Sequence, residues 1–208
     1  MQIYGALLSP FVRKVCLVAE EKGLDYELIL ATPHRDDPQL KGISPFGKIP
    51  ALRDGDFSLA DSTAIVTYIE ARHPAVPMLP ADPQSRGQAM WFDEFADTIL
   101  AGAGLKILFN RLVAPKLLKL PHDEAKALQG EAELPPMLAY LESVAPAAGW
   151  LAGADFSLAD IAVASVFRSL SSVGHGPDAG SHPATAAWYA RVCARPAWQR
   201  IAEREARR

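Results

Sequence analysis

The chain has 208 residues, of which 50% are hydrophobic and 22% are charged, a balance typical of a folded globular protein. A chain of this length can bury a sizeable core in one large or two small domains. Its net charge is −3, with Lys and Arg scattered among Asp and Glu, which argues against a nucleic-acid partner. No long apolar stretch and no N-terminal signal pattern occur, so no membrane association is expected.

The two cysteines, Cys16 and Cys193, are far apart in the sequence and belong to no CxxC pair. Two cysteines this far apart indicate reduced thiols rather than a disulfide framework. We therefore expect a cytoplasmic protein. No His and Cys spacing in the sequence predicts a metal site.

Strand and helix periodicity alternate over about the first 75 residues. A strand, a helix and a second strand in this order predict a parallel pair with a right-handed crossover. A hairpin signal then joins two further strands, and a helix follows them. The order is therefore βαβ followed by ββα, a small α/β domain. The predicted strands are residues 3–8, 26–30, 49–52 and 57–59, and the predicted helices are residues 10–22 and 61–72.

The character of the sequence changes after this domain. Residues 73–80 are rich in proline and cannot form a regular helix, so they predict a linker. Helical stretches without strand alternation follow, and we expect Pro115 and Pro146 to end helices. The predicted parts are an α/β domain at residues 1–76, a linker at residues 77–86 and an α-helical domain at residues 87–208.

One local signal in the second half is Ser157 followed three residues later by Asp160. In a capping box, the serine hydroxyl accepts a hydrogen bond from the third helical residue, whose carboxylate accepts one from the serine N–H. The helix that follows, through Phe167, is apolar almost all round. We therefore expect it to be the buried central helix of a bundle.

Ser9-Pro10 stands where the first predicted strand turns into the first predicted helix. The hydroxyl would lie at the positive end of the helix dipole, among N–H groups without helical partners, which suits a thiolate. An ordinary N-cap serine takes the same place, followed at the first helical position by a proline whose fixed φ already suits the helix. The local sequence leaves both roles open.

Four features follow one another along the chain: Ser9-Pro10, the Gly-Lys-Ile-Pro-Ala-Leu run at residues 47–52, Asp61-Ser62 and the Ser157–Asp160 box. Together they resemble the cytosolic glutathione transferase superfamily, and the resemblance covers essentially the whole chain. It implies a thioredoxin-like N-terminal domain that binds glutathione, followed by an α-helical bundle domain that binds an electrophile. The Ser-Pro-Phe start is most similar to serine-type classes such as tau, theta and zeta.

The resemblance implies that the Ser9 hydroxyl is catalytic and stabilises the glutathione thiolate. This matters because a free thiol has a pKa of about 8.5. Cys16 lies seven residues further along the same predicted helix, about 10 Å at 1.5 Å per residue. It is expected to face the core and cannot replace a residue at the helix start, which weakens the alternative of cysteine-based thiol transfer.

The glutathione-binding residues follow from the same resemblance. Pro50 would form a cis peptide bond, which turns the backbone of Ile49 toward the cysteinyl part of the ligand. Lys48 would lie near the glycyl carboxylate. Ser62 would bind the γ-glutamyl carboxylate, and Asp61 would lie near the γ-glutamyl amino group.

A polar contact from His34 is also possible, because some classes place one in this loop. An apolar pocket without acid–base groups is expected for the electrophile. Its candidate residues are Leu8, Phe11, Trp91, Phe95 and Ile99.

We therefore expect a glutathione transferase that acts on a small hydrophobic electrophile, with glutathione as co-substrate, no metal, and a homodimeric assembly. A peroxidase, isomerase or dehalogenase of the same fold would use the same thiolate. A non-catalytic module that binds other proteins is the alternative from a different class. The presence of Ser9 and Asp61-Ser62 favours the enzyme.

Overall fold

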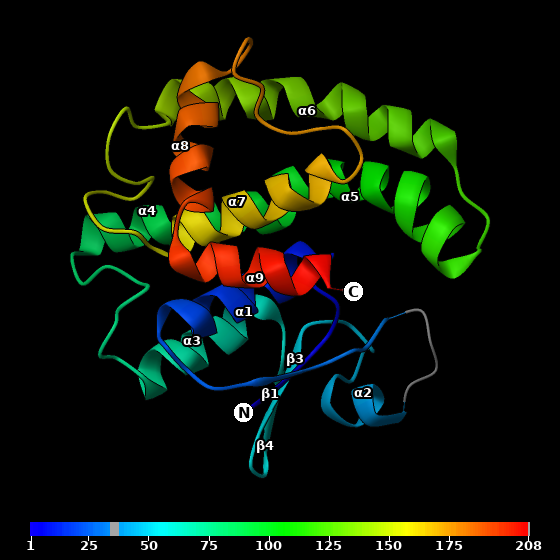
Figure 1. Ribbon diagram of the computed structural model, residues 1–208, viewed down its shortest axis with the longest axis vertical. Helices are drawn as coiled ribbons and strands as arrows, with labels where there is room; N and C mark the ends of the chain where they lie inside the picture. Colours follow the sequence, from blue (N-terminus) through cyan, green and yellow to red (C-terminus); the bar gives the residue numbers. More distant parts are fainter. Residues whose placement is uncertain (34–37, 208) are drawn as a thin grey trace. The chain divides into compact units, whose positions relative to one another are not determined.

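The computed structural model describes residues 1–33 and 38–207, which divide into two compact units (Figure 1). Unit 1 consists of Met1–Leu79 together with Arg195–Arg208, and unit 2 of Pro80–Ala194. The change of unit after Leu79 lies within the predicted linker. The C-terminal segment, which the sequence analysis assigned to the helical domain, is instead grouped with unit 1.

Unit 1 contains a four-stranded sheet with the strand order β2-β1-β3-β4. β1 pairs with β2 in parallel, whereas β3 is antiparallel to both β1 and β4, so the predicted βαβ–ββα order is confirmed. The first strand is shorter than its apolar run. It is followed by Gly5 at φ 152°, where a Cβ would lie 2.4 Å from Val12. The strands are β1 (Gln2–Tyr4), β2 (Glu27–Ile29), β3 (Ala51–Asp54) and β4 (Phe57–Ala60).

Helices cover both faces of this sheet. Because side chains alternate along a strand, Tyr4 and Ala51 share one face, where Leu40 packs against them. Ile3 and Leu52 lie on the other face and are fully buried, where α1 and α3 contact the strands and each other. The helices of unit 1 are α1 (Pro10–Glu21), α2 (Pro38–Ile43), α3 (Ser62–Arg72) and α9 (Pro196–Ala206).

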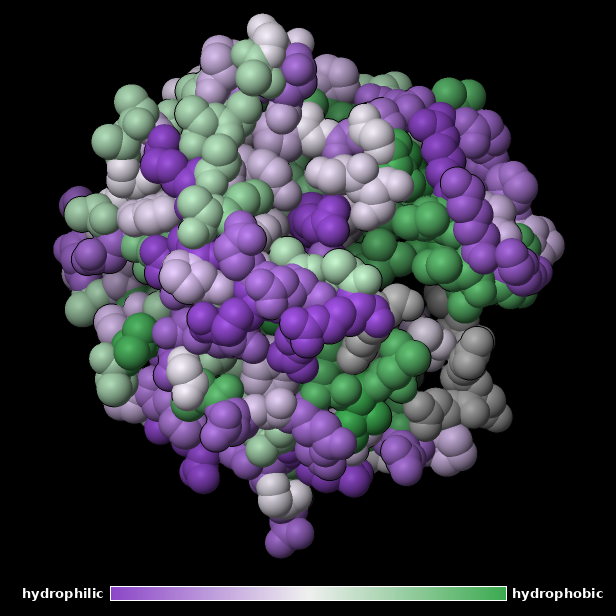
Figure 2. All heavy atoms as spheres, in the orientation of Figure 1, coloured by the Kyte–Doolittle hydropathy of each residue, from purple (hydrophilic) through white to green (hydrophobic). Residues whose placement is uncertain are grey.

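Charge pairs hold α9 against α1. The guanidinium of Arg13, which is buried, pairs with Glu205. Near the other end, Arg195 Nη2 lies 2.6 Å from Glu21 Oε2. These pairs join residues more than 170 positions apart, and they explain why the last helix is grouped with unit 1. The outward face of α9 is strongly hydrophilic (Figure 2).

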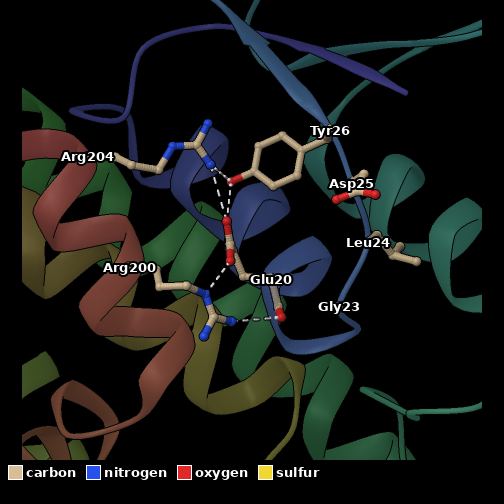
Figure 3. A pocket seen from close by; sticks show the side chains of 7 residues that line it. All are labelled: Glu20, Gly23, Leu24, Asp25, Tyr26, Arg200 and Arg204. Carbon is tan, nitrogen blue, oxygen red and sulfur yellow. Dashed lines mark hydrogen bonds and ion pairs between the residues drawn. The ribbon is translucent and has the colours of Figure 1, made fainter.

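A pocket of about 330 Å³ lies at the C-terminal end of α1, beside α9 (Figure 3). Glu20 accepts a hydrogen bond from Tyr26 Oη at 3.1 Å. Two arginines of α9, Arg200 and Arg204, point toward the same carboxylate, at 2.6 and 3.2 Å. This pocket lies at the opposite end of α1 from Ser9, so it is separate from the predicted site.

Unit 2 has no strand among its described residues, and one isolated bridge joins Trp150 and Gly153. Its first helical elements form one long helix, Pro83–Leu118, in which η1 and η2 have the wide turns of a π-helix. The expectation that Pro115 ends a helix was wrong, because the proline lies inside η2, where wide turns accommodate a residue without N–H. The elements are α4 (Pro83–Glu94), η1 (Phe95–Leu100), α5 (Ala101–Leu108), η2 (Phe109–Leu118), α6 (Glu124–Val144), α7 (Leu158–Ser171) and α8 (Pro183–Cys193).

The long helix Pro83–Leu118 has 36 residues and could cross a membrane by length and composition alone. However, 44% of its most apolar window is buried within the structure, and Leu100, Ala101 and Ile107 are fully buried. The core helix of a soluble bundle can have the same length and apolar composition, so this helix is weak evidence for a membrane span.

α7 is the buried central helix of unit 2, as predicted, and nearly all of its residues are buried. The predicted capping box is present at its start. Asp160 Oδ2 accepts a hydrogen bond from Ser157 N at 3.1 Å. Asp160 Oδ1 accepts from Leu151 N at 3.0 Å and from Trp188 Nε1 at 2.7 Å. One buried carboxylate therefore ties the start of α7 to the preceding loop and to α8.

Candidate active site

Three segments that carry predicted site residues meet at one end of the sheet. Tyr4, Ala51 and Ala60 lie side by side across β1, β3 and β4. β1 leads from Tyr4 toward the start of α1, and β4 leads from Ala60 directly into the start of α3. β3 begins immediately after the Ile49–Pro50 bond. Because the three strands are in register here, both helix starts and this bond lie at the same end of the sheet.

Ser9 is the N-cap residue of α1, with φ −70° and ψ 125°, and Pro10 is the first helical residue. The Ser9 carbonyl accepts a hydrogen bond from Arg13 N at 3.0 Å. In the described part of the chain, the Ser9 side chain makes no capping hydrogen bond at this helix end. Backbone geometry and proline therefore set the helix start without using the hydroxyl. Leu8 and Phe11, on either side, are half-buried.

The start of α3 is capped differently. Asp61 is the N-cap residue, and its Oδ1 accepts hydrogen bonds from Thr63 N and Ala64 N, both at 3.0 Å. Its φ is 81°, a conformation that non-glycine residues rarely adopt and that is often found at functional sites. Ser62 is buried, with 3% of its surface exposed. Asp61 therefore caps the helix, and the Ser62 hydroxyl is not needed for that task.

The segment before β3 has the backbone form expected from the resemblance, because the Ile49–Pro50 peptide bond is cis. Pro50 is buried, Ile49 is half-buried and Lys48 is exposed. The Lys48 N–H donates a hydrogen bond to Ser44 Oγ at 2.9 Å, which anchors the approach to the bond. His34, also a candidate, lies outside the described residues.

The cysteines do not supply a reactive thiol. Cys16 is fully buried, and burial raises its pKa to about 12 against the opposing effects of a Tyr26 hydrogen bond and the Arg204 charge. Burial also raises the pKa of Cys193. Both thiols therefore stay protonated at neutral pH. Within residues 1–33 and 38–207, no three His, Cys, Asp or Glu side chains are grouped to hold a metal ion.

Three candidates for the electrophile pocket lie in unit 2. Trp91 and Ile99 expose 48% and 39% of their surface. Phe95 is buried, with its ring centroid 5.3 Å from that of Tyr140, and Trp91 Nε1 donates to Tyr140 Oη at 2.7 Å. Trp91 and Ile99 are therefore exposed to solvent, while Phe95 packs against Tyr140. The sequence analysis missed Tyr140, because it lies 49 positions from Trp91 on another helix.

The structure thus defines a thioredoxin-like unit with two helix starts and a cis-proline segment at one end of its sheet, followed by an all-α unit. Family models described as the N-terminal and C-terminal domains of glutathione S-transferase match residues 3–77 and 100–196. Glutathione S-transferase 3 of Zea mays is 33% identical, over 96% of this chain and 92% of its own length. The chain belongs to the glutathione S-transferase family.

Solved structures of similar proteins agree with this assignment. The structure of a glutathione S-transferase from Rhodospirillum rubrum F11 has a TM-score of 0.88 and 26% identity, and the match covers 96% of this chain and 90% of that one. A structure of glutathione S-transferase-I bound with the ligand lactoylglutathione has a TM-score of 0.83 and 26% identity, with 97% and 98% covered. The predicted fold is confirmed.

Proposed function

We propose that this glutathione transferase ionises the thiol of glutathione beside Ser9 and directs the thiolate at a small apolar electrophile. The observation that carries the proposal is the Ser9 hydroxyl, which α1 does not use for capping although it lies at the positive end of the helix. Family membership supports glutathione as the co-substrate.

The chemistry needs a thiolate near neutral pH, whereas a free thiol has a pKa of about 8.5. The Ser9 hydroxyl would donate a hydrogen bond to the sulfur, and the dipole of α1 would favour its negative charge. Each effect contributes on the order of 1 kcal/mol, or most of a pKa unit. Together they would lower the thiol pKa by about one to two units, so that a larger share of bound glutathione is ionised at neutral pH.

The rest of glutathione would be held by the other two segments. Ser62 and the first turn of α3 would bind the γ-glutamyl carboxylate. Asp61 uses Oδ1 for capping, so its other oxygen would face the γ-glutamyl amino group. The Ile49 backbone would pair with the cysteinyl backbone as an added strand does, and Lys48 would lie near the glycyl carboxylate.

The substrate class and assembly are part of the same proposal. The candidate pocket residues Leu8, Phe11, Trp91, Phe95 and Ile99 have apolar side chains, which suits an apolar electrophile and a detoxifying role. The Ser-Pro-Phe start favours a tau-, theta- or zeta-like class. We expect a cytoplasmic protein that forms a homodimer. Light scattering on the purified protein would measure the molar mass of the assembly.

Calorimetric titration with glutathione tests the proposal. The parent protein should bind, and Ser62→Ala should bind about tenfold more weakly through loss of a hydrogen bond to a charged group. Ser58→Ala, at an exposed serine of β4, is the matched control and should bind like the parent. A parent protein that does not bind glutathione would overturn the proposal. If the parent protein binds glutathione, a screen of electrophiles and peroxides with glutathione would identify the reaction that it catalyses.

A further inference from the structure

Ser44 is a buried residue between α2 and β3 that the proposed site does not yet explain. It exposes 1% of its surface, although it lies in a loop directly after the last residue of α2. Its N–H donates a hydrogen bond to the Leu40 carbonyl at 2.7 Å, and its Oγ accepts one from Lys48 N at 2.9 Å. Ser44 therefore connects the end of α2 to the residue that precedes the Ile49–Pro50 bond.

The chain turns tightly between Ser44 and Lys48. The Ser44 carbonyl accepts a hydrogen bond from Gly47 N at 2.9 Å, which closes a four-residue β-turn. Pro45 stands at the second position of this turn, where its fixed φ is favoured, and Gly47 has a φ of 62° that suits glycine. The two oxygen atoms of Ser44 thus accept successive N–H groups, and this fixes the direction in which the chain enters Lys48.

The backbone of Lys48 depends on this hydrogen bond more than that of its neighbours does. Pro50 is buried and leads directly into β3 at Ala51, so the strand holds the far end of the segment. Lys48 itself is exposed and belongs to no helix or strand of the described structure. Without the Ser44 hydroxyl, water would take the place of the acceptor, and the fold would lose little. The Lys48 backbone would then be ordered only when a ligand binds, which costs affinity.

We propose that Ser44 is a positioning residue for glutathione, an inference that rests on the function proposed above. Its hydroxyl holds the Lys48 backbone so that the Lys48 ammonium is directed at the glycyl carboxylate of the ligand. Ser44 acts through Lys48 and does not touch the reacting sulfur. The sequence analysis assigned a ligand role to Lys48 but missed Ser44, because a serine before proline is also an ordinary turn residue.

Binding and turnover of three variants test this role. Lys48→Met removes the charge but keeps the backbone hydrogen bond, and it should weaken glutathione binding by about fivefold, the upper range for an exposed ion pair. Ser44→Ala should weaken binding by about threefold and raise KM similarly, with kcat nearly unchanged, because only part of the ion pair's contribution is lost. Ser143→Ala is the control, since it removes a serine hydroxyl that is hydrogen-bonded to the backbone in the last turn of α6. It should leave glutathione affinity unchanged.

The decisive measurement uses the C-terminal amide of glutathione, in which the glycyl carboxylate is replaced by a neutral carboxamide. The parent protein should bind this amide about fivefold more weakly than glutathione, and Ser44→Ala should cause no further loss, because the charge that Lys48 meets is absent. In the Lys48→Met background, Ser44→Ala should likewise cause no further loss of glutathione affinity. Equal losses for both ligands, additive losses in the double variant, or an unchanged affinity of Ser44→Ala for glutathione would overturn the inference while leaving the proposed function intact.

A parent protein that binds neither ligand would overturn the proposed function, which separates the two failures. If Ser44→Ala does not fold, as judged by circular dichroism, Ser44→Cys answers the same question, because a thiol has a similar size but is a weaker acceptor. This variant must lose affinity for glutathione but not for the amide. Equal effects on both ligands would again show that Ser44 is only structural.

Discussion

Two serines begin helices in this chain, and the two units use them in opposite ways. Ser157 is buried at the start of α7, where it forms a capping box with Asp160. Ser9 is half-buried at the start of α1, and within the described chain its side chain makes no capping hydrogen bond. The same residue type at the same helical position thus takes part in the cap in unit 2 and makes no capping hydrogen bond in the described part of unit 1. The surroundings of an N-cap serine, rather than its position, decide its role.

The largest effect is expected at the carboxylate that completes the Ser157 cap. Asp160→Ala leaves the N–H groups of Leu151, Ser157 and Trp188 without their acceptor, so it should lower the free energy of unfolding by about 3 kcal/mol or more. Unfolding in urea, monitored by tryptophan fluorescence, measures the free energy of unfolding. Asp82→Ala, at the exposed cap of α4, is the control and should show a smaller loss. Equal losses would mean that burial of the cap is unimportant.

Ser157→Ala should lower the free energy of unfolding by about 1 kcal/mol, because the capping hydroxyl is lost while Asp160 keeps its other partners. The same unfolding experiment measures the loss. Glutathione affinity and the pKa of the bound thiol, read from thiolate absorbance, should not change. A shift in that pKa would contradict a purely structural role for Ser157.

Ser9→Ala should show the reverse pattern. The pKa of bound glutathione should rise by most of a unit, just under 1 kcal/mol, because the sulfur loses a hydrogen-bond donor. Turnover at neutral pH should fall accordingly and recover as the pH is raised through the new pKa. The free energy of unfolding should change by less than about 0.5 kcal/mol, since the hydroxyl makes no cap. An unchanged thiol pKa with a loss of stability would make Ser9 an ordinary cap.

The smallest effect is expected from Asp61→Gly. Glycine relieves the strain of a φ of 81°, but it removes the capping carboxylate and adds freedom to the unfolded chain. These terms offset one another, and the free energy of unfolding should change by less than about 0.5 kcal/mol. Asp61→Ala is the comparison, because it loses the cap and keeps the strain. A larger loss for glycine than for alanine would show that φ at this position is not strained.

Much of the architecture was predictable because its signals are local. The alternation of periods predicted the order of strands and helices in the first domain, and the spacing of Ser157 and Asp160 predicted the cap of the central helix. The resemblance carried by residues 47–52 predicted the cis bond before Pro50. The position of Pro115 was not predictable in this way, because a proline disfavours a regular helical turn but fits the wide turns of η2. The binding and catalytic roles of the site residues remain predictions for the experiments above.

By itself the sequence determined which elements form and where several helices start, since apolar periods, capping residues and prolines act within a few positions of one another. Only the tertiary structure decided how the charged and aromatic side chains are used, because their partners lie far away along the chain. The contact of Lys14 with Thr63, the pairing of Arg13 with Glu205 and the hydrogen bond from Trp91 to Tyr140 are of this kind. The tertiary structure also separated the two serines, because whether a hydroxyl at a helix start makes a cap is seen only when the backbone around it is known.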